Sequence, residues 1–83
     1  MTGNVDIKIT VSFTGLVNIK SISSGDTVVI NNGANISELL SKLGIKEEHK
    51  RFIVTMVNGN KENQYYILKN CDEVKLFLPV GGG

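Results

Sequence analysis

The segment Asn35-Ile-Ser-Glu-Leu-Leu-Ser-Lys-Leu-Gly44 carries every local signal of one amphipathic helix. Its apolar residues recur at the i, i+3, i+4 and i+7 positions, namely Ile36, Leu39, Leu40 and Leu43. Such a stripe occupies one side of a helix and is expected to pack on a sheet. Asn35 and Glu38 have the spacing of a capping box, and Gly44 supplies the left-handed residue that ends many helices. The pattern predicts a helix from Ile36 to Leu43.

Two strands are predicted before this helix. Val5 to Phe13 alternates apolar and polar residues without interruption, which indicates a strand with one buried face. Thr27 to Ile30 is β-branched throughout and ends at Asn31-Asn-Gly33, so it is predicted to be the next strand. The intervening Leu16 to Gly25 segment fits either a second strand piece or an ordered loop.

The sequence after the helix predicts more strands. The charged run Lys46 to Arg51 mixes both signs and is interpreted as a solvated loop or a frayed helix end. Phe52 to Val57 is apolar on both faces apart from Thr55, as expected for a strand covered on both sides or near the sheet centre. Asn58-Gly59 is a strong hairpin signal. The remaining segments are predicted as a polar loop at 61–64, a short strand or turn at 65–68, a turn at 69–72 and a last strand from Glu73 to Val80.

This order of elements predicts an α+β protein with the β-grasp fold. A right-handed crossover through the helix sets the strand after it parallel to a strand before it. We therefore expect a mixed sheet of four to five strands with one packed helix. The chain is predicted to form one domain over residues 1–80, followed by a flexible glycine tail over residues 81–83.

Composition argues against several classes of partner. Among 83 residues, 41% are hydrophobic and 20% are charged, which is typical of a folded globular domain, and the formal net charge is only +1. Because the charges are scattered, nucleic acid is not an expected partner. No apolar run approaches the roughly 18 residues of a membrane span, so no membrane association is expected. A lone Cys71 cannot form an internal disulfide, which favours a reducing, cytoplasmic location.

No motif of an independent enzyme is visible. The sequence has no Cys or His pair at metal spacing, no phosphate-binding loop ending in Lys-Ser or Lys-Thr, and no nucleophile motif. The single histidine, His49, lies in the charged run and is interpreted as solvent-facing. Cys71 is interpreted as a passive, partly buried thiol in preference to a persulfide acceptor or redox thiol, since no basic residue adjoins it closely. We expect no metal, no bound cofactor and no intrinsic enzymatic activity.

The unusual feature is the end, Leu78-Pro-Val-Gly-Gly-Gly83, where a strand leads directly into three glycines. It is either a frayed terminus or cloning scar, or a functional tail. Glycines carry no side chains, so three extended residues reach roughly 10 Å and fit a channel of backbone width. The carboxylate at the tip is a poor electrophile until adenylation by ATP. A sulfur nucleophile would then give a thiocarboxylate, and a lysine amine an isopeptide bond.

The residues Leu68-Lys-Asn-Cys-Asp-Glu-Val-Lys-Leu-Phe-Leu-Pro-Val-Gly-Gly-Gly83 resemble the closing pattern of the ubiquitin-like sulfur carriers. These include the small subunit of molybdopterin synthase and the thiamine-pathway sulfur carrier, and the resemblance spans nearly the whole chain. Two residues depart from the pattern. Cys71 stands where the family usually has Gly, which could strain the turn, and a single Pro79 stands where the molybdopterin subunit usually has two prolines. Pro79-Val80 still favours the molybdopterin type.

The resemblance implies that Gly83 carries the acyl adenylate and then the thiocarboxylate, while Gly81 and Gly82 give a slim approach. It also implies three partners: an adenylyltransferase like the ubiquitin-activating enzymes, which uses ATP; a persulfide enzyme as sulfur donor; and a sulfur-accepting synthase subunit. Phe77 and Pro79, on the face opposite Leu76, are candidates for an apolar docking patch, or are simply buried by a loop or the helix. The alternatives are a modifier joined to lysines through Gly83 and a β-grasp binding module with an incidental tail.

Overall fold

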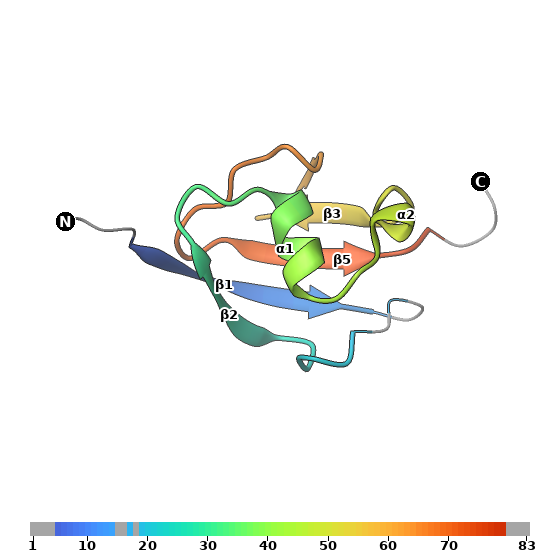
Figure 1. Ribbon diagram of the computed structural model, residues 1–83, viewed down its shortest axis with the longest axis horizontal. Helices are drawn as coiled ribbons and strands as arrows, with labels where there is room; N and C mark the ends of the chain where they lie inside the picture. Colours follow the sequence, from blue (N-terminus) through green and yellow to red (C-terminus); the bar gives the residue numbers. More distant parts are fainter. Residues whose placement is uncertain (1–4, 15–16, 18, 80–83) are drawn as a thin grey trace.

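The computed structural model describes residues 5–14, 17 and 19–79 and shows a five-stranded sheet with helix α1 across one face (Figure 1). The strands are β1 Asp6–Phe13, β2 Asp26–Asn31, β3 Val54–Val57, β4 Asn60–Glu62 and β5 Glu73–Phe77, and the helices are α1 Ile36–Lys42 and α2 Glu47–Lys50. None of the helices in this part of the chain is long and apolar enough to span a membrane.

The strand order β2-β1-β5-β3-β4 places the last strand at the centre of the sheet. β1 pairs antiparallel with β2 and parallel with β5, and β3 pairs antiparallel with both β5 and β4. It follows that β3, the first strand after α1, runs parallel to β2, the strand before it. The predicted crossover and the predicted β-grasp fold are therefore confirmed.

The core lies between α1 and the sheet. Ile36, Leu39 and Leu40 of α1 are fully buried, and they pack in one cluster with Ile9 and Val11 of β1. Each such side chain stabilises the fold by about 1.5–3 kcal/mol relative to an exposed one. These contacts fix the helix across the sheet and leave the opposite sheet face open.

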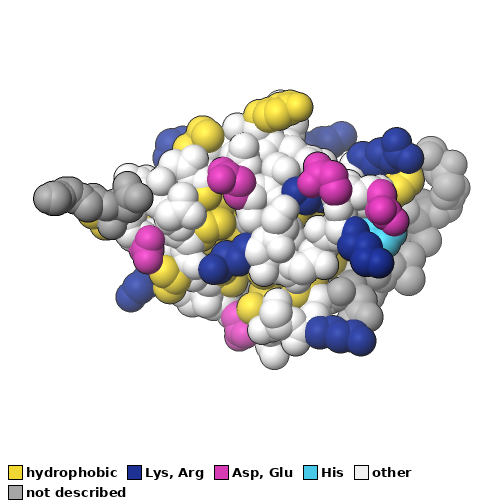
Figure 2. Space-filling model, in the orientation of Figure 1, with side chains coloured by type: hydrophobic (Ala, Val, Ile, Leu, Met, Phe, Trp, Pro, Cys, Tyr) yellow, Lys and Arg dark blue, Asp and Glu magenta, His cyan; other side chains and the backbone are white. Residues whose placement is uncertain are grey.

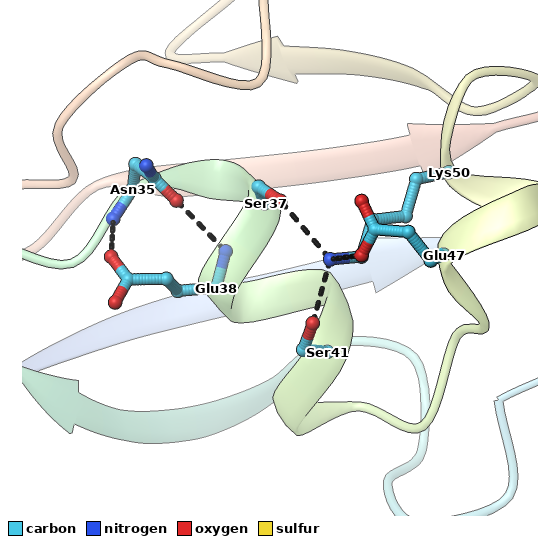
Figure 3. Close-up of polar contacts among 6 residues, drawn as sticks. All are labelled: Asn35, Ser37, Glu38, Ser41, Glu47 and Lys50. Atoms are coloured by element: carbon cyan, nitrogen blue, oxygen red, sulfur yellow. Dashed lines mark hydrogen bonds and ion pairs between the residues drawn. The ribbon is translucent and has the colours of Figure 1, made fainter.

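The ends of α1 follow the sequence signals. The Asn35 side chain accepts a hydrogen bond from the Glu38 N–H at 2.8 Å, and the Glu38 carboxylate accepts one from the Asn35 N–H at 2.9 Å (Figure 3). Gly44 has φ +90°, and the Ile45 N–H donates to the Leu40 carbonyl behind it. The predicted helix, its capping box and its stop are confirmed.

The charged run 46–51 differs from its prediction. It forms the short helix α2, and Lys50 is only 4% exposed. The Lys50 ammonium donates to Ser37 Oγ at 3.0 Å and Ser41 Oγ at 2.6 Å on α1, and lies 2.8 Å from Glu47 Oε1 (Figure 3). Interpreting the whole run as solvated was wrong because the two α1 hydroxyls give this ammonium hydrogen-bond partners in place of water.

Five further segments differ from expectation or resolve an open choice. Residues 60–62 form the edge strand β4, of which 61 and 62 were predicted to be loop. Phe52 lies outside β3 and is 54% exposed, although β3 does lie next to the central strand.

The described residues between β1 and β2 form a loop, and Ile67 makes only an isolated bridge to Asn35. β5 ends at Phe77, and Val80 of the predicted last strand lies outside the described residues.

Candidate functional site

The predicted functional tail, Gly81 to Gly83, lies outside the described residues, and the structure shows the platform that precedes it. This platform is the central strand β5 with Leu78 and Pro79. β5 is held by β1 on one side and β3 on the other, and its arrow points to the end of the molecule where α2 lies (Figure 1). A strand paired on both edges is a rigid base for a tail.

The turn in front of β5 is organised by the buried carboxylate of Asp72. Its Oδ1 accepts from Asn58 Nδ2 at 2.9 Å, and its Oδ2 accepts from the Lys69 N–H at 2.9 Å and the Tyr66 hydroxyl at 3.2 Å. Asn58 in turn accepts from the Glu73 N–H through its side chain and donates its own N–H to the Glu73 carbonyl. This network joins the β3–β4 hairpin to the first residue of β5.

Cys71 occupies this turn with φ +72°, in the left-handed region that favours glycine. The predicted strain at this departure from the family pattern is therefore confirmed. Its N–H donates to the Lys8 carbonyl at 2.8 Å. Its side chain is exposed, so the expected partial burial of this thiol was wrong. The backbone bond explains why the turn keeps this conformation despite the Cβ atom.

Consecutive residues at the end of β5 point to opposite faces of the sheet. Phe77 is half-buried on the face away from α1, in register with Val54 of β3. It borders a hollow of about 450 Å³ that we call the open-face patch, lined chiefly by Thr10, Ser12, Met56, Lys75 and Phe77. Pro79 is exposed. The structure thus places both predicted docking residues on accessible surface and does not bury Phe77 under α1.

Leu78 faces the other way and borders a groove of about 500 Å³ on the helix side. The groove is lined by Val17, Gly44, Ile45, Lys46, His49, Phe52, Ile53 and Leu78. Phe77 and Leu78 therefore border two hollows, one on each face of the sheet. This groove was not predicted from the sequence because its lining comes from three separate segments. The apolar residues Phe52 and Ile53 after the charged run were a signal for it.

The described residues hold no catalytic constellation. His49 and Cys71 are both exposed, and within residues 5–14, 17 and 19–79 no group of three or more His, Cys, Asp or Glu side chains is placed to hold a metal. Positive and negative side chains are interspersed over the face seen in Figure 2. What the platform offers is a rigid strand end with apolar surface on both sides.

Comparison with known proteins agrees with this arrangement. The ThiS family model matches residues 13–83. No curated protein sequence matches significantly. A Pyrococcus furiosus protein described as molybdopterin converting factor, subunit 1, is 20% identical with a TM-score of 0.70, and 89% of this chain covers 99% of that one. Small archaeal modifier protein 1 of Haloferax volcanii is 18% identical with a TM-score of 0.69, over 89% of this chain and 99% of that one.

A third similar structure is a complex of subunits 1 and 2 of the molybdopterin-converting factor of Helicobacter pylori. Its matching chain is 27% identical with a TM-score of 0.55, over 93% of this chain and 100% of that one. The two archaeal likenesses support the fold, and the family match covers most of the chain. The chain therefore belongs to the ThiS family of ubiquitin-like sulfur carriers.

Proposed function

We propose that this protein is a cytoplasmic sulfur carrier for cofactor biosynthesis, and that its working group is the carboxylate of Gly83. An adenylyltransferase joins this carboxylate to AMP from ATP and releases pyrophosphate. Sulfide attacks the acyl carbon and displaces AMP, which gives the thiocarboxylate directly. A persulfide donor instead forms an acyl disulfide with loss of AMP, and a thiol must then reduce the S–S bond to free the thiocarboxylate. The thiocarboxylate carries sulfur to an acceptor. The protein acts as co-substrate of its partners.

The observation that carries this proposal is that the family match runs to residue 83 and so includes all three glycines. A tail without side chains can enter a narrow site where a bulkier terminus would collide. The platform adds support, because the central strand β5 and Leu78 lie between two hollows just before the tail in the sequence. A partner can grip the body while the tail reaches its active site.

Three partners follow from this chemistry: the adenylyltransferase, a persulfide enzyme that donates sulfur, and a synthase subunit that accepts it. The synthase partner is supported by the similar Helicobacter pylori complex of two subunits. The pair Pro79-Val80 before the glycines favours the molybdopterin type over the thiamine type. We propose molybdopterin biosynthesis as the pathway served.

The adenylation step is tested by ATP–pyrophosphate exchange with a cognate activating enzyme. The intact protein should stimulate exchange, and a variant lacking Gly82 and Gly83 should not, because the acyl group is then displaced from the active site. Equal exchange with both proteins would refute the role of the tail.

The open-face patch is proposed to dock the activating enzyme. Phe77→Asp should leave the fold intact, because this side chain is only half-buried on the open face, but should lower adenylation at least about tenfold by placing a charge in an apolar contact. Tyr65→Asp is the matched control, since Tyr65 is 82% exposed in the segment between β4 and β5. A folded Phe77→Asp variant with full activity would remove the docking role.

The modifier alternative makes a separate prediction. If Gly83 is joined to lysines, the native cell should contain conjugates of higher mass that disappear when Gly83 is deleted. A sulfur carrier leaves no such conjugates but still forms the thiocarboxylate. Immunoblotting of cells that carry the intact chain and of cells that carry the Gly83 deletion therefore distinguishes a protein modifier from a sulfur carrier.

A further inference from the structure

The outer edge of β2 is an unpaired sheet edge of unusual composition. β2 pairs with β1 on one side, and no described strand pairs with it on the other (Figure 1). It is six residues long and its only charged residue is Asp26, at its first position. Proteins usually protect such edges with charges, prolines, bulges or short length. β2 has none of these devices along Thr27 to Asn31.

The other edge of the sheet is protected. β4 has only three residues, Asn60–Glu62, and two of them are charged. Short length and charge both disfavour pairing with another strand. The contrast makes β2 the edge on which a further strand could add.

The hydrogen-bond pattern shows which backbone groups face that edge. The Asn32 N–H donates to the Val5 carbonyl at 3.2 Å, whereas the Thr10 N–H donates to Asp72 on the β5 side at 3.0 Å. The backbone groups of odd-numbered residues of β1 therefore form hydrogen bonds with β2. Ile9 is paired with Val28, so the even-numbered residues of β2 are the ones that bond to β1. Backbone groups alternate between the two edges of a strand. In β2, the backbone N–H and C=O groups of Thr27 and Val29, and the N–H of Asn31, must therefore point away from β1.

The side chains along this edge fit a copy of themselves. Val28 and Ile30 are buried towards the core, while Thr27, Val29 and Asn31 are exposed, with Val29 45% exposed. Val29 is the centre of the segment 27–31, with an aliphatic residue on each side of it and a polar residue beyond each of those. This order of residue types is nearly the same in both directions. An antiparallel two-fold arrangement centred on Val29 would place Val29 opposite Val29 and Thr27 opposite Asn31. No like charges would be opposed.

We propose that β2 is a self-association surface through which two copies of this chain form one continuous antiparallel sheet, with the two-fold axis at Val29. The contact is isologous, and the short charged β4 edge does not offer a second such site, so association should stop at the dimer. A six-residue edge buries less than a standard stable interface, so the dimer should be weak and concentration-dependent. β1 separates β2 from β5, so the contact does not involve the strand that precedes the tail.

Disulfide mapping tests the position of the axis. In a Cys71→Ser background, Val29→Cys should cross-link under oxidised glutathione, because directly opposed residues of a hydrogen-bonded pair lie about 5.5 Å apart between Cα atoms, within disulfide reach. Thr27→Cys alone should cross-link at least about tenfold more slowly, but should cross-link readily when mixed with Asn31→Cys. Equal rates for Val29→Cys and Thr27→Cys alone would indicate random collision and overturn the proposal.

Sedimentation over about a hundredfold concentration range gives the second test. The Val29 N–H is not used within the fold, so Val29→Pro should keep the native circular dichroism and remove the central hydrogen bonds of the dimer. The unsubstituted chain should shift from monomer to dimer with concentration, and Val29→Pro should stay monomeric. An unsubstituted chain that is monomeric throughout, or a folded Val29→Pro variant that dimerises equally, would overturn the proposal.

Discussion

At the scale of single residues, the turn before β5 contains two neighbours with opposite effects on stability. Cys71 holds a left-handed backbone conformation that disfavours any Cβ atom. Asp72 is 5% exposed and accepts three hydrogen bonds from separate segments. The turn is thus strained at one residue and tied down by the next.

Cys71→Gly should raise the free energy of unfolding by about 1 kcal/mol, because it removes the left-handed strain and keeps the backbone bond to Lys8. Cys71→Ala is the control, since it removes the thiol but retains the Cβ atom. Urea denaturation measures both. If Cys71→Ala raises the free energy of unfolding as much as Cys71→Gly does, the thiol and not the left-handed backbone is the cause of the lower stability.

Asp72→Asn should lower the free energy of unfolding by about 2–3 kcal/mol, because its NH₂ group would meet donors where the carboxylate now accepts. The neighbouring exposed carboxylate supplies the control, and Glu73→Gln should change stability by less than about 0.5 kcal/mol. Equal small losses for both variants in the same denaturation assay would contradict the proposed role of the network.

At the scale of elements, α2 is attached to α1 through one buried ammonium group. Lys50 reaches two hydroxyls on α1 and one carboxylate on its own helix, Glu47, whose side chain is 83% exposed. An ion pair to so exposed a group contributes little, whereas the partly buried hydrogen bonds to Ser37 and Ser41 replace the water that the ammonium loses. The attachment therefore depends on the serines more than on the salt bridge.

Lys50→Met should cost about 1–2 kcal/mol of stability, because the apolar stem still packs but Ser37 and Ser41 lose their partner. Glu47→Gln should cost at most about 0.5 kcal/mol. Thermal unfolding of both variants, with hydrogen exchange over 46–51, measures the difference. A larger loss of stability in Glu47→Gln than in Lys50→Met would show that the ion pair, and not the serine hydroxyls, attaches α2 to α1.

Some of these elements could be predicted from the sequence and others could not. α1, its capping box and the Asn58-Gly59 turn were predictable because their signals lie within a few residues of each other. Burial of Lys50 was not, because its partners lie 9 and 13 residues away on another element. The polar run 60–62 became β4 only because the preceding hairpin brings it against β3.

At the scale of the whole molecule, the fold presents one strand end between two apolar hollows. Alternation along β5 was enough to predict that Phe77 and Leu76 lie on opposite faces, and the structure confirms it. The groove beside Leu78 was not predictable, since it requires the β1–β2 loop, α2 and β5 to meet. The proposed roles of Gly83, Phe77 and Pro79 remain predictions.

The most direct test of the sulfur-carrier proposal is the intact mass of the protein after incubation with ATP, a cognate activating enzyme and a sulfide source. The proposal predicts a mass increase equal to the exchange of one oxygen for sulfur, located in the C-terminal peptide and absent when Gly82 and Gly83 are removed. An activating enzyme shown to be competent on its own carrier, yet yielding neither adenylate nor thiocarboxylate on this chain, would contradict it.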